Sequence, residues 1–365
     1  MLRRIAPLSI GGAALVVAVA ACGSSSSGSA SSSSTSSGGT QTSVVSATIT
    51  APATEQSFAI WVALAEGFFT KNGVNMKLIP SSSGGADTIA VVESGSADFS
   101  VQDSLVPIKA MEKGATIKYL MMPELGNAQQ ISISKAAPGV SKVEAAATAA
   151  DKVKALKGSK YKIGVSTTAS SSYSYLYTAA KLYGLSTASG GDISITALGT
   201  PQNEIVGINA HKVDGVAGVP PTTTQENTLQ IPLDEVSPFN EMAGSYLFTS
   251  DKFIKSSPKT VQAVVTAMIQ ACQFIAKNPT KASADVVKAA QAADPTTKTA
   301  KEQTSFKTSL PHFQSPYPSQ QAYNSLEKLT DGTPPAGPFP AYTTGVDPSF
   351  AKTSFTKLGL QVPTG

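Results

Sequence analysis

The segment most informative about the fold is residues 58–80, which read FAIWVALAEGFFTKNGVNMKLIP. Residues 58–69 have the apolar spacing of an amphipathic helix, and Asn72-Gly73 is a turn sequence. Residues 74–80 follow as a strand, because apolar side chains recur there at every second position. A helix, a tight turn and a strand in this order are typical of α/β layers.

The same alternation continues on both sides of this stretch. It predicts strands at 44–49, 97–101, 117–122, 130–134, 162–165, 193–197, 214–217 and 246–249 and helices at 87–94, 105–113, 151–156, 173–183, 202–210 and 258–277. Strands that alternate with helices favour parallel sheets covered by helices. The chain of 365 residues is long enough for two domains or one large one.

Two parts of the chain share one spacing pattern. Ile89 in a predicted helix precedes Asp98 at the head of a strand, and Ile205 precedes Asp214 in the same way at the same separation. The pattern predicts two similar lobes, although any α/β chain can show such a repeat.

The N-terminus reads as a targeting segment. Arg3 and Arg4 precede a short apolar run at residues 10–20, which is too short for a comfortable membrane span of about 20 residues. The run ends in Val19-Ala20-Ala21-Cys22, which resembles the bacterial lipobox, where a diacylglyceryl group is attached to the cysteine. We therefore expect a signal peptide at 1–21 and a lipid on Cys22; the alternative is an ordinary signal with a chance cysteine.

Residues 23–43 consist almost entirely of Ser, Gly and Thr, which predicts a flexible tether of roughly 25 Å r.m.s. span. After residue 21 all basic residues are lysines, 26 against 24 acidic residues, and they form no dense tract. Nucleic acid is thus not an expected partner. Cys272, the other cysteine, lies in an apolar helical stretch and is expected to be a buried small side chain.

The order of short motifs resembles one known family. These motifs are the helix at 58–69, Lys71-Asn72-Gly73-Val74, the Ser/Gly loop at 81–85, ESGSADF at 93–99, Lys113-Gly114, Leu156-Lys157-Gly158, Ile163-Gly164-Val165, Val213-Asp214-Gly215 and Asn278-Pro279. The sequence is similar, over roughly residues 46–290, to the solute-binding proteins of ABC importers in the nitrate/sulfonate/taurine and thiamine-pyrimidine-precursor group.

The resemblance implies an α/β, two-lobed fold of the type II periplasmic-binding-protein kind, with two strand crossings at a hinge. The crossings would fall near 122–131 and 237–247. Lobe 1 would comprise 44–127 plus 248–365, and lobe 2 would comprise 128–247. The implied protein is a monomeric lipoprotein on the extracytoplasmic face of the cell membrane, which binds a small organic molecule or oxyanion between its lobes and delivers it to ABC permease subunits.

Open α/β sheets bind ligands beyond the carboxyl ends of their strands, where helix N-termini point. We therefore expect the ligand at five loops that would meet in the cleft. Their candidate ligand-binding residues are Thr54, Gln56, Ser82, Ser83, Gln102, Asp103, Ser104, Thr167, Ser170, Ser171, Tyr173, Val219 and Pro220. For each serine the alternative role is ordinary helix capping.

The residue types in these loops limit the ligand. Hydroxyls and backbone N–H groups at helix starts can hold an oxyanion, but no arginine is present to clamp a carboxylate or phosphate. Asp103 would suit N–H donors or a positive charge and would repel a sulfonate; it could instead cap the helix after it. On balance the loops favour a neutral or heteroaromatic molecule, on which Tyr173 could stack, whereas Trp61 fits core packing better.

An enzyme is the competing class, since the thiamine-precursor branch includes proteins with chemistry on the same fold. The two histidines, His211 and His312, lie in no nucleophile motif, and no Walker loop or zinc motif occurs. We therefore expect no catalysis, no cofactor and no metal site. A sensory or structural lipoprotein would explain the anchor but not the paired lobes.

Overall fold

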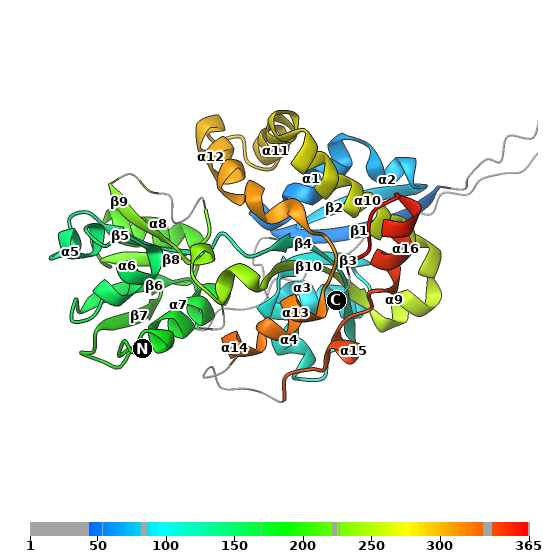
Figure 1. Cartoon of the computed structure of the whole chain (residues 1–365). Helices are drawn as coiled ribbons and strands as arrows, with labels where there is room; N and C mark the ends of the chain where they lie inside the picture. Colours follow the sequence, from blue (N-terminus) through cyan, green and yellow to red (C-terminus); the bar gives the residue numbers. More distant parts are fainter. Residues whose placement is uncertain are drawn as a thin grey trace, which may run out of the picture. The chain divides into compact units, whose positions relative to one another are not determined.

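Two five-stranded sheets organise the protein in a computed structural model that describes residues 44–52, 54–81, 86–168, 170–220, 225, 227–330 and 338–363 (Figure 1). The expected signal peptide, Cys22 and the tether lie outside these residues. Sheet A has the order β2-β1-β3-β10-β4. Its strands are β1 (Val45–Pro52), β2 (Val74–Ser81), β3 (Phe99–Asp103), β4 (Ile117–Leu125) and β10 (Ala243–Ser250).

Sheet B has the order β7-β6-β8-β5-β9. Its strands are β5 (Gln130–Ser134), β6 (Tyr161–Val165), β7 (Ile193–Ala197), β8 (Gly215–Gly218) and β9 (Thr228–Pro232). The chain passes from sheet A to sheet B between β4 and β5 and returns between β9 and β10. The two-lobed α/β class is therefore confirmed.

The expected parallel pairing holds for part of each sheet, and each sheet also contains antiparallel pairs. β1 runs parallel to β2 and β3, and β6 parallel to β7 and β8, but β10 is antiparallel to both its neighbours and so is β5. β10 and β5 each enter a sheet directly after the chain has crossed from the other one, so they arrive from the opposite direction. The short strand β9, whose apolar alternation covers only Leu229 and Ile231, was not predicted.

Helices flank both sheets. In the part built on sheet A these are α1 (Phe58–Ala65), α2 (Phe68–Lys71), α3 (Ala86–Ser94), α4 (Leu105–Met111), α9 (Asp251–Ser256), α10 (Pro258–Lys277), α11 (Pro279–Ala293), α12 (Thr299–Ser309), α13 (Gln320–Ser325), α14 (Glu327–Thr330), α15 (Tyr342–Gly345) and α16 (Ser349–Lys357), with the 3-10 turns η1 (Glu55–Ser57) and η4 (Leu310–Gln314). In the part built on sheet B they are α5 (Val140–Glu144), α6 (Ala149–Ala155), α7 (Ser171–Leu182) and α8 (Pro201–Asn209), with η2 (Leu233–Glu235) and η3 (Phe239–Glu241).

The predicted helix at 58–69 is two helices. α1 ends at Ala65, and Gly67 adopts φ +67°, a left-handed conformation that glycine reaches without a Cβ penalty. The chain turns there, and α2 begins at Phe68. The apolar face continues across the break, so the spacing of residues looks like one helix.

Apolar packing covers sheet A on both faces. On one face Phe58 in α1 contacts Trp61, Phe306 and Phe313 at ring centroid distances of 5.7, 5.6 and 6.5 Å, and these side chains share a core with α10. Trp61 is buried in this core, as is Cys272. On the other face α3, α4 and α13 pack in a second core that continues into sheet B. Figure 1 shows α1 and α10 on one side of sheet A and α3, α4 and α13 on the other.

The paired Ile/Asp spacing of the sequence has a structural cause. Thr48 in β1 donates its backbone N–H to Asp98 Oδ2 (2.7 Å), and Lys162 in β6 donates its N–H to Asp214 Oδ2 (2.8 Å). Each aspartate therefore fixes the start of its own strand to the neighbouring parallel strand. The two sheets therefore repeat one construction, in which an aspartate ties neighbouring parallel strands together.

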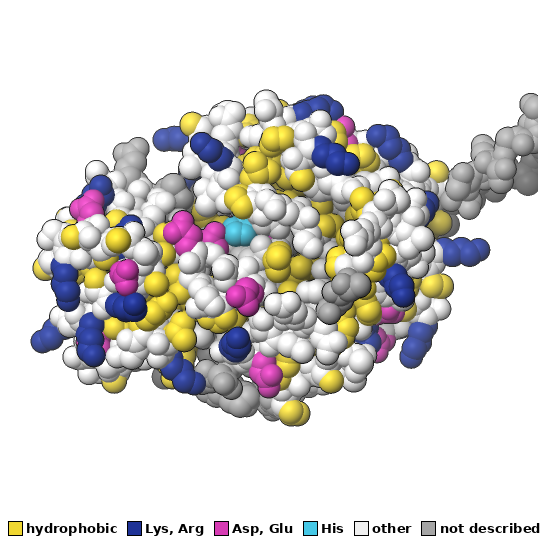
Figure 2. Space-filling view, viewed as in Figure 1, with side chains coloured by type: hydrophobic (Ala, Val, Ile, Leu, Met, Phe, Trp, Pro, Cys, Tyr) yellow, Lys and Arg dark blue, Asp and Glu magenta, His cyan; other side chains and the backbone are white. Residues whose placement is uncertain are grey.

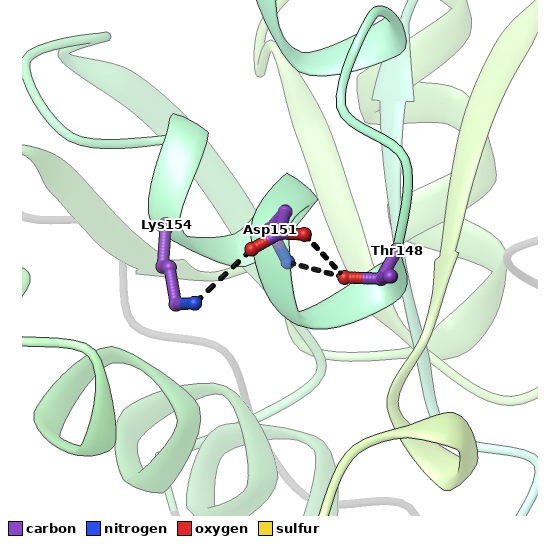
Figure 3. Close-up of polar contacts among 3 residues, drawn as sticks. All are labelled: Thr148, Asp151 and Lys154. Atoms are coloured by element: carbon purple, nitrogen blue, oxygen red, sulfur yellow. Dashed lines mark hydrogen bonds and ion pairs between the residues drawn. The ribbon is translucent and has the colours of Figure 1, made fainter.

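Local capping sets the helix starts in sheet B's lobe. In α6, Thr148 Oγ1 accepts the N–H of Asp151 (3.1 Å) and donates to Asp151 Oδ2 (2.7 Å), while Lys154 Nζ donates to Asp151 Oδ1 (3.0 Å; Figure 3). Thr200 caps α8 in the same way and is followed by a proline, as the sequence predicted.

The connection after β4 touches the start of β10 at two glycines. Gly126 donates its N–H to the carbonyl of Met242 (2.6 Å), and a Cβ on Gly244 would lie only 1.8 Å from the Gly126 carbonyl oxygen. Gly126 itself adopts φ +74°, and a Cβ there would meet His312 Nδ1 at 2.9 Å. The crossing is therefore built from backbone against backbone.

Candidate functional site

A group of buried carboxylates lies where β1, β3 and β4 end. Glu55 is in η1 just after β1, Asp103 is the last residue of β3, Glu124 lies near the end of β4, and Glu302 is in α12. All four residues are buried. We call them the acidic cluster, and the charges of the other three act electrostatically on Glu55.

Glu55 is the most unusual member of the cluster. Its residue is 2% exposed, and neither side-chain oxygen has a hydrogen-bond partner in another described residue, although its own backbone N–H acts on the carboxyl and lowers the pKa. Burial raises the pKa of this carboxyl well above its usual range, and the charges of Glu124, Asp103 and Glu302 raise it further. A carboxyl held in this way gains free energy from any cation or hydrogen-bond donor that reaches it.

Asp103, by contrast, is fully engaged. It accepts hydrogen bonds from the N–H of Leu105 (3.0 Å) and from Asn127 Nδ2 (2.9 Å), and the Ser171 hydroxyl also bonds to it. Burial raises its pKa in spite of these bonds. The Leu105 bond is the capping role foreseen for this residue. The bond with Ser171, at the start of α7, joins the end of sheet A to the lobe of sheet B.

Two further contacts join the same two lobes. Lys109 Nζ in α4 donates to Ser174 Oγ in α7 (2.9 Å), and burial lowers the pKa of this lysine. His312 Nε2 in η4 lies 3.1 Å from Asp234 Oδ2 in η2, while its Nδ1 lies 3.0 Å from the Leu125 carbonyl oxygen. Burial alone would lower the His312 pKa, but Asp234 and Glu124 outweigh it, and the pKa is raised.

The predicted residues of sheet A's lobe have different surroundings. Gln102 and Asp103 are the last two residues of β3 rather than loop residues, because the strand extends two positions further than its apolar pattern. Ser104 is buried and donates Oγ to the Ala243 carbonyl (2.7 Å), which is a structural contact. Gln56 is buried beside Glu55, and Thr54 is half-buried. Ser82 and Ser83 lie outside the described residues.

In sheet B's lobe the predicted residues surround the N-terminus of α7. Ser170 caps the helix by accepting the N–H of Tyr173 (3.2 Å) and donates to the Thr167 carbonyl (2.7 Å), while Thr167 is exposed. Tyr173 is half-buried and stacks on Tyr177 at 5.9 Å. After β8, Val219 is half-buried and Pro220 buried. Of these residues, Ser171 contacts the acidic cluster, because its hydroxyl bonds to Asp103.

Sequence reasoning missed Glu55, Glu124 and Asn127. Glu55 stands between two residues that were predicted, Thr54 and Gln56, and a charged residue in the polar segment after a predicted strand was a usable signal. Glu124 carried no such signal, because its strand was expected to end at Met122 and runs on to Leu125.

The described part of the chain offers no candidate metal site and no exposed thiol. Its residues contain no group of three or more His, Cys, Asp or Glu side chains placed to hold a metal ion. Cys272 is buried in α10 with Sγ 3.8 Å from the Pro123 carbonyl oxygen, and burial raises its pKa. A groove of about 260 Å³ lies elsewhere, beside His211 and Asp214, and none of the predicted ligand-binding residues lines it.

The charge around the site comes from acids and lysines. Lysines are spread over the face shown in Figure 2 rather than gathered in one patch. No arginine occurs among the described residues, since Arg3 and Arg4 are the only two in the sequence. Among described residues, no helix is long and apolar enough to cross a membrane.

We expect the protein to lose stability as the pH rises from 5 to 8. Burial raises the pKa of Glu124 to about 7, well above its unfolded value of about 4.3. The folded state therefore binds this proton more tightly, and the stabilisation is complete below about pH 4.3 and is lost as the pH rises through about 7. His312, with its raised pKa, acts in the same direction above about pH 6.5.

Melting temperatures measured by circular dichroism across this pH range check the expectation. Glu124→Gln should flatten the decline, whereas Glu144→Gln, which removes an exposed carboxylate 3.5 Å from Lys135, should leave the slope unchanged. An equally steep decline in both variants would show that Glu124 does not carry the effect.

Comparisons with known proteins agree with this geometry. The two lobes and their crossings define the class of periplasmic binding proteins. The ligand-binding component of an ABC-type import system from Staphylococcus aureus has 14% identity and a TM-score of 0.67, over 85% of this chain and 99% of that one. The periplasmic aliphatic sulphonate binding protein SsuA from Escherichia coli has 18% identity and a TM-score of 0.62, over 79% and 86%.

The nitrate-binding protein NrtA from Synechocystis PCC 6803 has 12% identity and a TM-score of 0.66, over 88% of this chain and 92% of that one. No curated protein matches the sequence. The model of the NMT1/THI5-like family matches residues 54–282. The chain belongs to this family.

Proposed function

We propose that the protein is the solute-binding component of an ABC importer, which holds a small molecule between its lobes and delivers it to the permease. The observation that carries the proposal is the contact of Asp103 with Ser171 and Asn127 at the carboxyl end of sheet A. Polar side chains from both lobes are buried together there, at the edge where open α/β sheets bind ligands. Lobe 1 (44–127 plus 248–365) and lobe 2 (128–247) are the proposed moving parts.

Closure would follow from population shift, because a solute that contacts both lobes stabilises the closed form. The proposed contacts are the ligand-binding residues predicted from the sequence together with Glu55, Glu124 and Asn127. The same proposal makes the protein a monomer that binds its solute without converting it.

A thermal-shift panel tests this function. Sulfonates, nitrate, pyrimidines, flavin-like compounds and amines are added in turn to the purified chain, each at millimolar concentration. A solute at about 100 times its dissociation constant contributes about 2.7 kcal/mol to folding, which raises the melting temperature by roughly 5–10 °C. No shift with any class contradicts solute binding, and turnover of a compound would favour the enzyme interpretation.

We further propose that a lipid on Cys22 anchors the protein to the extracytoplasmic face of the cell membrane. The lipobox-like residues before Cys22 and the Ser/Gly tether after it support this proposal. Cys22→Ala should move the protein from the membrane pellet to the soluble fraction, as measured by immunoblotting after ultracentrifugation. Cys22→Ala protein that still sediments with membranes would contradict the anchor; Cys272→Ala is the matched control.

A further inference from the structure

Among the described residues, Glu55 is the carboxyl whose two side-chain oxygens are both buried without a hydrogen-bond partner in another residue. Burying a carboxyl without a hydrogen-bond partner lowers the stability of the fold. Such a group in a folded protein calls for an explanation, and a bound ligand is one. The 3-10 turn η1 holds Glu55 between the end of β1 and the start of α1, and it packs against β3 and α12. The position of the side chain is thus fixed by the fold.

The charges that act most strongly on Glu55 are acidic, those of Glu124, Asp103 and Glu302. The turn η1 packs against β3 and α12, the elements that carry Asp103 and Glu302. Phe99, Val101 and Asp103 stand at every second position of β3, so their side chains lie on the same face of sheet A. Phe99 and Val101 lie in the core that α1 and α10 share. Asp103 is therefore on the face where η1 lies. The strand register sets Ser245 opposite both Asp103 and Glu124.

Asn127 supplies an observation independent of the acids. Its Nδ2 donates to Asp103, so the amide points toward the acidic cluster, and its Oδ1 accepts no hydrogen bond among the described residues although the residue is 4% exposed. Both oxygens of Glu55 and the oxygen of Asn127 are hydrogen-bond acceptors. The unpartnered oxygens of Glu55 and Asn127, together with the Thr54 and Ser245 hydroxyls that also lack a partner among the described residues, match a ligand group that carries several N–H donors and a positive charge.

The two cations near the cluster are already committed. Lys109 donates to Ser174, and His312 lies against Asp234. Neither one neutralises Glu55. An anionic solute would have to lie beside the buried carboxyl of Glu55 without an arginine to offset its charge, whereas a cation would meet its counter-charge there.

Resting on the proposed solute-binding function, we infer that the acidic cluster binds a positively charged nitrogen group of the solute, of the ammonium, amidinium or guanidinium class, with Glu55 as its principal acceptor. The inference departs from the neutral or heteroaromatic ligand favoured by the sequence, because that view counted Asp103 as the carboxylate of the loops and left out Glu55. It also separates this chain from the proteins of the same fold that are named for sulphonate or nitrate.

Two series of small compounds test the inference; within each series the shape is similar and the charge is positive, zero or negative. Isothermal titration calorimetry of the purified full chain is run with benzamidinium, benzamide and benzoate, and with acetamidinium, acetamide and acetate. We expect the amidinium of at least one series to bind at least tenfold more tightly than its neutral and anionic partners. We also expect its affinity to rise between pH 5 and 8, with proton release, because a cation favours the ionised carboxyls.

Variants locate the site. Glu55→Gln should weaken amidinium binding at least tenfold while circular dichroism shows an unchanged fold, and Glu144→Gln should bind like the parent. Tighter binding of benzoate or acetate, no binding of either amidinium at 20 mM, or equal affinity in Glu55→Gln would overturn the inference. If the inference fails but a sulfonate, nitrate or pyrimidine raises the melting temperature, the proposed solute-binding function still stands. If no compound of the thermal-shift panel raises the melting temperature, the proposed function fails as well.

Discussion

Asp103→Ala is expected to lower the free energy of unfolding by about 3 kcal/mol and to abolish solute binding. The substitution leaves the buried N–H of Leu105 without its acceptor, and Asn127 Nδ2 keeps only its long bond to the Gly244 carbonyl (3.4 Å). Ser171 loses its bond across the lobes. Each unsatisfied buried group costs about 1–3 kcal/mol. Lost binding follows because the carboxylate links sheet A to the start of α7.

Urea unfolding followed by circular dichroism measures the stability change, and thermal shift with the solute found in the panel measures binding. Asp103→Asn is the matched control: it keeps an oxygen for the Leu105 N–H, so it should cost clearly less than the alanine. If Asp103→Ala changes the free energy of unfolding by less than about 0.5 kcal/mol and still binds the solute, Asp103 neither stabilises the fold nor takes part in binding.

Gly244→Ala should be the second large effect, with a loss of about 3 kcal/mol or more. The new Cβ would lie 1.8 Å from the Gly126 carbonyl oxygen, which is backbone and cannot rotate away. The connection after β4 or the start of β10 must then shift, and with it the hydrogen bond from the Ser104 N–H to the Gly244 carbonyl (3.2 Å). The melting temperature should fall on the order of 10 °C.

Gly139→Ala separates crowding from backbone strain. Gly139 adopts φ +77° and has no heavy atom within 4 Å of the added Cβ, so this variant should lose only about 1–2 kcal/mol. Differential scanning calorimetry of both variants gives the comparison. Equal losses, or a smaller loss for Gly244→Ala, would mean that the connection after β4 does not pass close to the start of β10 at Gly126 and Gly244.

The alternation of strands and helices could be predicted from the sequence because each element is amphipathic or apolar by itself. Every predicted strand from 44–49 to 246–249 is present within a few residues. Strand direction could not be predicted in this way, because β5 and β10 receive their direction from the crossing between sheets and not from their own residues. Apolar alternation is the same in parallel and antiparallel strands.

The candidate site was predictable only in part. Loops at the carboxyl ends of strands could be found from the strand order, which led to Asp103 and Ser171. Glu124 could not be found, because it lies in a strand rather than a loop and a bulged antiparallel partner, β10, brings it to the cluster. The paired Asp98 and Asp214 show the converse: a clear repeat in the sequence whose role is to fix strands.

The proposed function requires that this chain hold one small solute between its lobes. Native mass spectrometry of the full chain, purified gently from its host, is the strictest test of that requirement. We predict a 1:1 complex with a small organic molecule that is released on unfolding and is missing from Asp103→Ala protein prepared in parallel. A chain that carries no small molecule, and that takes up none when incubated with the full solute panel, would contradict the proposed function.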